Sequence, residues 1–263
     1  MAKKERSAEN RSIDPAAQEM LIRADELGIG TAFHRADQMP PCNIGGAGMC
    51  CKLCGMGPCR LTKDGQTGVC GATIDTIQAR NLVRAIAAGS AAHSDHGRDI
   101  LEVFAATADG TTTGYAIRDE GKLQALAAEL GVATEGRDKL EIAHDVADAM
   151  MEDFGSRKSR LGFADRVPEQ RLDLWAKLGI MPRGIDRENV EMLHRTHMGV
   201  DNDYVNTLLH GLRTSLSDGW GGSMVATELS DVMFGTPQPV VSTVNLGALR
   251  PECVNIALHG HNP

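Results

Sequence analysis

Apolar positions recur three or four residues apart over most of this chain, which is the spacing of one face of an α-helix. Segments with this periodicity are 15–27, 74–108, 119–130, 138–153, 169–178, 187–197, 201–215 and 224–234. The longest of them begins with Ile74, Ile77, Leu82, Ala85 and Ile86, which we assign to its apolar face. The pattern predicts a mainly helical protein.

Residues with known helix-capping preferences bound several of these segments. Asp14 stands before Pro15, an N-cap followed by proline at the first helical position, and Gly28 follows the last apolar position of that segment. Asp186 is expected to cap a later helix in the same way. The glycine-rich sequence at 219–222 is expected to break the helical pattern.

The pattern changes near the C-terminal end. Glycine and proline punctuate 235–239, and the apolar run at 254–258 is predicted to be a β-strand that ends just before His259 and His261. One strand cannot satisfy its own backbone hydrogen-bonding groups, and this sequence offers it no partner strand. We therefore interpret 237–263 as the start of a Rossmann-like α/β domain that is truncated here.

The remaining chain divides into two further regions. Residues 1–11 are polar and charged without periodicity, so we expect a disordered tail there. Residues 12–236 are expected to form a helical domain that carries a cysteine-rich loop at 40–71. The expected fold class is thus mainly α, followed by the first strand or strands of a truncated α/β domain.

Composition excludes some classes of function. The formal net charge is −8, whereas proteins that bind nucleic-acid phosphates present a basic surface, so no nucleic-acid partner is expected. No run of 18 apolar residues and no secretory pattern occur, which predicts no membrane span and a cytoplasmic location. Clustered free thiolates also fit a reducing compartment.

The cysteines indicate the chemistry. Six of the seven lie between residues 42 and 70. Four follow the spacing C-x2-C-x4-C-x10-C, namely Cys51, Cys54, Cys59 and Cys70. Four thiolates from one loop are the ligand set of a [4Fe–4S] cluster, and the many glycines of this loop let backbone N–H groups approach the sulfurs. The loop is therefore predicted to hold an iron–sulfur cluster.

Other interpretations of these cysteines stay open. Disulfides are disfavoured by the odd cysteine count and by the adjacent Cys50 and Cys51. Structural zinc sites prefer two separated C-x2-C units, and only one is present. Cys42 and Cys50 remain unassigned by this count. We hypothesise that they meet the same pair of a second copy across a two-fold axis and together supply four ligands.

Two histidine pairs stand three residues apart within predicted helices. His93 and His96 follow the small residues at 89–92, and on spacing alone they are interpreted as solvated surface histidines. His194 and His197 could bind a metal, but no third ligand lies nearby in sequence. Core or hydrogen-bonding roles are therefore favoured for that pair.

Several motifs together resemble the anaerobic nickel–iron carbon monoxide dehydrogenases. The cysteine run from Cys42 to Cys59, with GPCR at its end, is similar to the family's cluster motif. The motifs GSAAHSDHG, LHRTHMGVD and HGHNP follow in the family's order, at 89–97, 193–201 and 259–263. The resemblance extends from about residue 12 to the last residue.

The resemblance implies roles for the candidate residues. The C-x2-C-x4-C-x10-C quartet matches the ligands of the family's [4Fe–4S] B cluster. Cys42 and Cys50 match the pair given to the D cluster, which two subunits share. His93 matches a histidine that moves protons beside the active-site cavity, with His96 as a relay. His261 matches the histidine ligand of the nickel–iron–sulfur C cluster.

The implied activity is oxidation of carbon monoxide, CO + H2O to CO2 + 2 H+ + 2 e−. The resemblance also implies a homodimer and a small ferredoxin-like electron acceptor. Family subunits are more than twice as long, and their remaining C-cluster ligands and catalytic lysine lie downstream, so this chain alone is expected to be inactive. Alternatives are a hybrid-cluster protein of the hydroxylamine-reductase type, a non-enzymatic iron–sulfur electron-transfer module and a zinc-binding interaction module.

Overall fold

A computed structural model describes residues 6–39, 42–155 and 160–238 of the chain. It divides into two compact units, Met1–Cys50 and Cys51–Pro263, which are described separately below. This division falls inside the cysteine-rich loop and differs from the 12–236 domain expected from the sequence. The strand expected at 254–258 lies outside the described residues.

The first unit consists of short helices. Its elements are α1 (Ala8–Arg11), α2 (Pro15–Glu26), α3 (Ala32–Gln38) and α4 (Asn43–Gly46). The predicted start of α2 is confirmed, because an Asp14 side-chain oxygen accepts a 3.1 Å hydrogen bond from the Ala16 amide. Gly28 follows this helix with φ +67°, a left-handed conformation that favours glycine.

Residues 6–11 belong to the segment that was expected to be a disordered tail, and they include helix α1. Arg11, in α1, is 8% exposed, and its guanidinium lies 3.2 Å from an Asp25 carboxylate oxygen. Arg6 Nε lies 2.6 Å from Asp37 Oδ1, and Asp37 is itself buried. The polar composition of this segment therefore serves ion pairs with α2 and α3, which hydrophobic periodicity cannot reveal.

The second unit is a helical assembly with one small sheet. Strands β1 (Cys50–Cys51) and β2 (Cys59–Arg60) pair, and the helical elements follow them. These are α5 (Ile74–Ala108), α6 (Glu120–Leu130), α7 (Lys139–Gly155), the 3₁₀ turn η1 (Gly162–Arg166), α8 (Glu169–Leu178), α9 (Ile185–Arg195), α10 (Tyr204–Ser217), η2 (Asp218–Ser223) and α11 (Met224–Phe234). The mainly helical fold is confirmed, and none of the described helices is long and apolar enough to cross a membrane.

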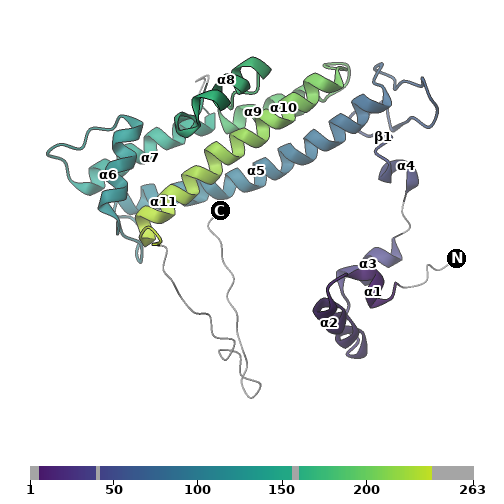
Figure 1. Ribbon diagram of the computed structural model, residues 1–263, viewed down its shortest axis with the longest axis horizontal. Coiled ribbons are helices and arrows are strands. Elements are labelled where there is room, and N and C mark those ends of the chain that lie inside the picture. The colour runs from purple at the N-terminus through teal and green to yellow at the C-terminus, as the bar shows by residue number, and fades with distance from the viewer. Residues whose placement is uncertain (1–5, 40–41, 156–159, 239–263) are drawn as a thin grey trace. The chain divides into compact units, whose positions relative to one another are not determined.

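Helix α5 is the element against which the others pack. Figure 1 shows α10 and α11 running along it, and it also contacts α7 and α9. Its buried positions alternate four and three residues apart: Val83, Ala87, Ser90, Ser94, Gly97, Leu101, Phe104 and Ala108. The middle of this stripe is small and partly polar. Because such residues give no apolar signal, the sequence pattern predicted the wrong buried face for part of this helix. Leu82, which was assigned to the apolar face, is 53% exposed.

The sequence at 219–222 was predicted to break the helical pattern, and this prediction is wrong. Residues Asp218–Ser223 form a π-helical turn that connects α10 directly to α11. A Cβ atom on Gly222 would lie 2.8 Å from Ser94 Cα, and one on Gly97 would lie 2.6 Å from the Gly222 carbonyl oxygen. These glycines permit backbone contact between η2 and α5, which explains why a long helix tolerates them.

The other predicted helix limits agree with the structure to within two residues, apart from the start of α10 at Tyr204 instead of 201, but the expected N-cap of α9 is wrong. This helix begins after Gly184, so Asp186 lies in its first turn instead of at its N-cap. Its carboxylate pairs with Arg98 on α5 at 2.7 Å. Helix α9 ends at Arg195, so His197 lies beyond it and does not share a helix with His194.

Two of the four hydrophobic cores in the described residues lie toward the two ends of α5. The larger one joins the C-terminal half of α5 to α6, α7 and α11, and includes Leu101, Phe104, Leu126, Met150 and Leu229. The smaller one lies at the N-terminal end of α5, where Leu61, Ala72 and Ile77 pack against Cys51. The cysteine loop therefore has a hydrophobic support of its own.

Candidate functional site

The four cysteines of the predicted cluster motif line one pocket beside the start of α5. Cys51 lies in β1 and Cys59 in β2, while Cys54 is in the connecting turn and Cys70 precedes α5. All four are free thiols. The turn depends on Gly57, where a Cβ atom would lie 3.1 Å from both the Cys51 carbonyl oxygen and the Cys59 amide nitrogen. Glycine thus lets the loop bring its thiols to one place.

The spacing of the thiols fits a cluster better than a single zinc ion. Zinc bonds to sulfur at about 2.3 Å, and tetrahedral geometry then places sulfurs about 3.8 Å apart. In the described part of the chain no three cysteine sulfurs lie within 4.8 Å of one another. The sulfurs of the four cysteines are therefore not gathered as closely as a single tetrahedral zinc ion would hold them.

Cys70 has a distinctive environment among these ligands. The Arg80 guanidinium donates to its sulfur over 3.6 Å. Burial raises the pKa of the Cys70 thiol, but hydrogen bonds from Arg80 and from the Ala72 and Gly199 amides outweigh burial, and the pKa lies below its ordinary value. Arg80 Nε, which is also buried, finds no partner among the described residues. The pocket thus offers a stabilised thiolate and an unused donor, both of which suit a cluster of iron and sulfide.

Cys42 and Cys50 belong to the first unit. Cys42 is the exposed N-cap of α4, where its sulfur accepts from the Gly45 amide over 3.5 Å, and Cys50 is half-buried in β1. Their role as a pair shared with a second subunit stays a prediction.

His93 pairs with a residue that sequence reasoning missed. Its Nδ1 lies 2.8 Å from Asp218 Oδ2, at the start of η2. Burial raises the pKa of Asp218, against the opposing effect of His93. The other carboxylate oxygen, Oδ1, is buried without a partner in the described structure. No sequence spacing links these two residues, which are brought together only because the glycines of η2 let it approach α5.

The remaining predicted site residues are less defined. His96 is exposed one turn along α5 from His93, and the structure does not test its predicted relay role. His261 lies outside the described residues, as does Cys253, the seventh cysteine, for which no role was predicted. His194 and His197 are both exposed, which excludes the core role of the two that were expected, while the hydrogen-bonding role stays a prediction.

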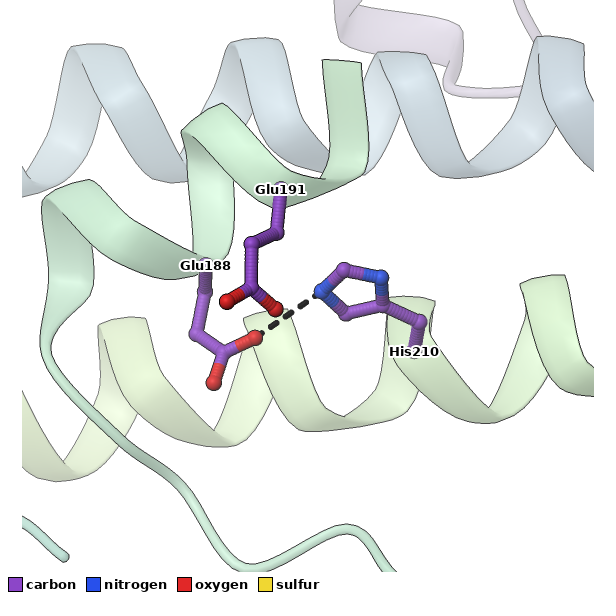
Figure 2. Close-up of side chains that lie close together, drawn as sticks. All are labelled: Glu188, Glu191 and His210. Carbon is purple, nitrogen blue, oxygen red and sulfur yellow. Dashed lines mark hydrogen bonds and ion pairs between the residues drawn. The ribbon is translucent and has the colours of Figure 1, made fainter. Parts of the chain in front are cut away.

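One group of described residues lies close enough to hold a metal ion and was not predicted. Figure 2 shows Glu188 and Glu191 of α9 facing His210 of α10, with ligand atoms within 4.8 Å of one another. His210 Nε2 lies 2.9 Å from Glu188 Oε2, and both residues are almost completely buried. The pairing joins two helices, so neither helix alone carries a sequence signal for it.

Arginines already neutralise this group. Arg183 contacts both glutamates at 2.5 Å, Arg213 Nε lies 2.9 Å from Glu188, and Arg187 Nε lies 2.9 Å from Glu191. A divalent cation would have to displace these guanidinium groups and would be repelled by them. We interpret the group as a structural ion-pair network.

Comparisons with known proteins agree with the cysteine site. The family model described as the Prismane/CO dehydrogenase family matches residues 49–263. Carbon monoxide dehydrogenase 1 of Methanosarcina mazei is 53% identical over 265 residues, covering 99% of this chain and 42% of that protein. Carbon monoxide dehydrogenase 1 of Methanosarcina acetivorans is 53% identical over 261 residues, covering 98% and 42%.

A similar solved structure is a nickel-free carbon monoxide dehydrogenase from Thermococcus sp. AM4. It matches with a TM-score of 0.84 and 48% identity, covering 96% of this chain and 41% of that one. The chain thus spans about two fifths of the length of the relatives it matches.

Proposed function

This chain belongs to the Prismane/CO dehydrogenase family, and we propose that it supplies the electron-exit site of a nickel-dependent carbon monoxide dehydrogenase. The proposed reaction is CO + H2O to CO2 + 2 H+ + 2 e−. The observation that carries the proposal is the pocket lined by the quartet Cys51, Cys54, Cys59 and Cys70. A [4Fe–4S] cluster held there would accept and pass on single electrons.

The electron path is proposed to continue to a second site. Cys42 and Cys50 lie outside the C-x2-C-x4-C-x10-C motif, and Cys42 is exposed. We propose that the pair joins its copy in a homodimer to hold a shared cluster, from which a small ferredoxin-like protein takes electrons in the cytoplasm. An exposed donor thiol fits such an arrangement better than a buried one.

The proton path is proposed to begin at His93. If His93 Nδ1–H donates its hydrogen bond to Asp218 Oδ2, Nε2 is left free to take up a proton released during CO oxidation. The hydrogen bond to Asp218 would hold the histidine ring in this orientation. His96 would pass the proton outward along α5. His261 is proposed as a ligand of the nickel–iron–sulfur centre where CO reacts.

The rival functions have less support. The relatives described above are named for CO oxidation, which favours that activity over hydroxylamine reduction. A zinc module is disfavoured because no three cysteine sulfurs of the described residues lie within 4.8 Å of one another. The long helices behind the loop exceed what a simple electron carrier needs, and their His93–Asp218 pair gives them a further use.

Metal analysis of anaerobically purified protein tests the proposal. We expect about four irons per chain from the quartet, or about six if half of a shared cluster is added. The reduced protein should give the electron paramagnetic resonance signal of a [4Fe–4S] cluster, and that signal should be lost in Cys54→Ser but kept in Cys253→Ser. Stoichiometric zinc without iron would overturn the proposal.

A further inference from the structure

Arg80 is a buried cation next to the cysteine pocket. It lies on the second turn of α5, is 1% exposed and lines the pocket together with the quartet. Its Nη1 is 3.6 Å from the Cys70 sulfur, a distance at which a guanidinium donates to a thiolate. A buried charge is costly unless an opposite charge balances it.

The segment at 201–202 fixes Arg80 in place. Arg80 Nη2 donates to the Asp201 carbonyl oxygen and to Asn202 Oδ1, both at 2.9 Å. Asn202 Nδ2 in turn donates to the Cys70 carbonyl oxygen at 2.9 Å, and Thr76 Oγ1 donates to the Asn202 carbonyl at 2.7 Å. Asp201, the last residue of the LHRTHMGVD motif, thus has a structural role in holding Arg80.

The oxygen partners of Arg80 are neutral. Among these contacts the Cys70 sulfur is the one atom that would also bind the cluster, and it is the contact that brings the guanidinium next to the four cysteines. The guanidinium also keeps an unpaired donor, Nε, at this buried place. The contact with Cys70 and the unpaired Nε both place the positive charge of Arg80 beside the pocket that the four cysteines line.

We propose that Arg80 raises the reduction potential of the cluster held by the quartet, so that this cluster accepts electrons more readily. The inference rests on the proposed function, because it requires a cluster in the pocket. One-electron reduction adds one negative charge to the cluster and its thiolates, while no bond forms or breaks. A fixed buried cation stabilises the more negative state, and hydrogen bonds to cluster sulfurs act in the same direction.

Arg84 provides a matched control. It lies one turn further along α5, and its Nη1 donates to the Leu193 carbonyl oxygen at 3.3 Å and to Thr196 Oγ1 at 2.9 Å. Like Arg80, Arg84 links α5 to a distant part of the chain, here the end of α9, but it makes no hydrogen bond to a cysteine sulfur. Replacing it removes a positive charge and a helix-to-loop contact while leaving the environment of Cys70 in place.

The experiment is a potentiometric titration of the full chain, purified anaerobically and followed by electron paramagnetic resonance. The midpoint potential should become more negative in Arg80→Gln, less so in Arg80→Lys, and stay near the wild-type value in Arg84→Gln. An unchanged midpoint in an Arg80→Gln protein with full iron content would overturn the proposal. If the wild-type chain holds no cluster at all, the proposed function fails instead.

A second measurement covers the case in which Arg80→Gln does not fold. Wild-type protein labelled with ¹⁵N-arginine should show a ¹⁵N hyperfine coupling to the reduced cluster, because the Arg80 guanidinium donates to a ligand sulfur. The coupling should persist in Arg84→Gln and vanish in Arg80→Lys. Absence of the coupling in iron-replete wild-type protein contradicts the proposal.

Discussion

At the scale of single residues, Glu188 shows how a buried charge can determine stability. Its side chain is 0% exposed. Burial raises the pKa of Glu188, but hydrogen bonds from His210 and Arg183 and the charge of Arg213 overcome this effect and lower the pKa to about 2. A carboxyl group with a lowered folded-state pKa stabilises the fold above its unfolded pKa, and that stabilisation is lost as pH falls toward the folded value.

We therefore predict an acid-dependent contribution from Glu188. The free energy of unfolding should fall by about 3 kcal/mol as pH drops from about 5 to about 2 through this group alone. Burial also lowers the pKa of His210, which adds a loss in the same direction below about pH 6.5. Urea titrations at several pH values measure the effect.

Glu188→Gln separates this effect from other carboxylates. At neutral pH the substitution should cost about 3–5 kcal/mol, since it leaves the arginines without their partner. The difference from wild type should shrink on acidification. The exposed Glu169→Gln should change little. A constant difference at every pH would show that the charge of Glu188 does not contribute.

The His93–Asp218 pair leads to a second prediction at this scale. In a full-length, nickel-loaded carbon monoxide dehydrogenase that contains this chain, Asp218→Asn should lower CO-dependent dye reduction about 10- to 100-fold, because the neutral amide no longer orients the histidine ring. The pH profile of the rate should change shape as well. Asp95→Asn is a suitable control, since Asp95 is exposed on α5 and pairs with Arg98 instead. Equal losses in both variants would exclude a specific role for Asp218.

At the scale of elements, the contact between η2 and α5 depends on the absence of side chains. Gly222→Ala would place a Cβ atom 2.8 Å from the Ser94 backbone, where neither helix can yield cheaply. We expect destabilisation of about 1–3 kcal/mol. Gly219→Ala, in the same turn, meets no atom within 4 Å and should be neutral or stabilising by up to about 1 kcal/mol. Thermal unfolding of the two variants checks the prediction, and equal effects would contradict it.

The same contact marks the limit of what the sequence predicts about elements. Helical spacing correctly located α6, α7, α8 and α11, because each buries an apolar face. It misplaced the buried face of α5, whose centre consists of serine, alanine and glycine, and it read the glycines of η2 as a break. Close packing of two backbones uses residues that hydropathy treats as neutral.

At the scale of the whole molecule, the cysteine spacing predicted the ligand quartet but not its surroundings. Ligands from one loop leave a local signature, since a short segment must supply them all. Arg80 and Asn202 are more than one hundred residues apart in sequence, and the network around Glu188 draws on two helices. Such partners become visible only when the helices pack. The division at Cys50 likewise depends on tertiary contacts and was not evident from composition.

The last prediction concerns the assembly. If Cys42 and Cys50 hold half of a shared cluster, replacing both with serine should remove about two irons per chain and leave about four on the quartet. The molar mass in solution should fall toward that of one chain, because the bridging ligands are gone. Cys253→Ser, outside the C-x2-C-x4-C-x10-C motif, should change neither quantity. Iron analysis combined with light scattering makes the comparison. Loss of all the iron would mean that the two sites depend on each other, and an unchanged iron content would rule out the shared cluster.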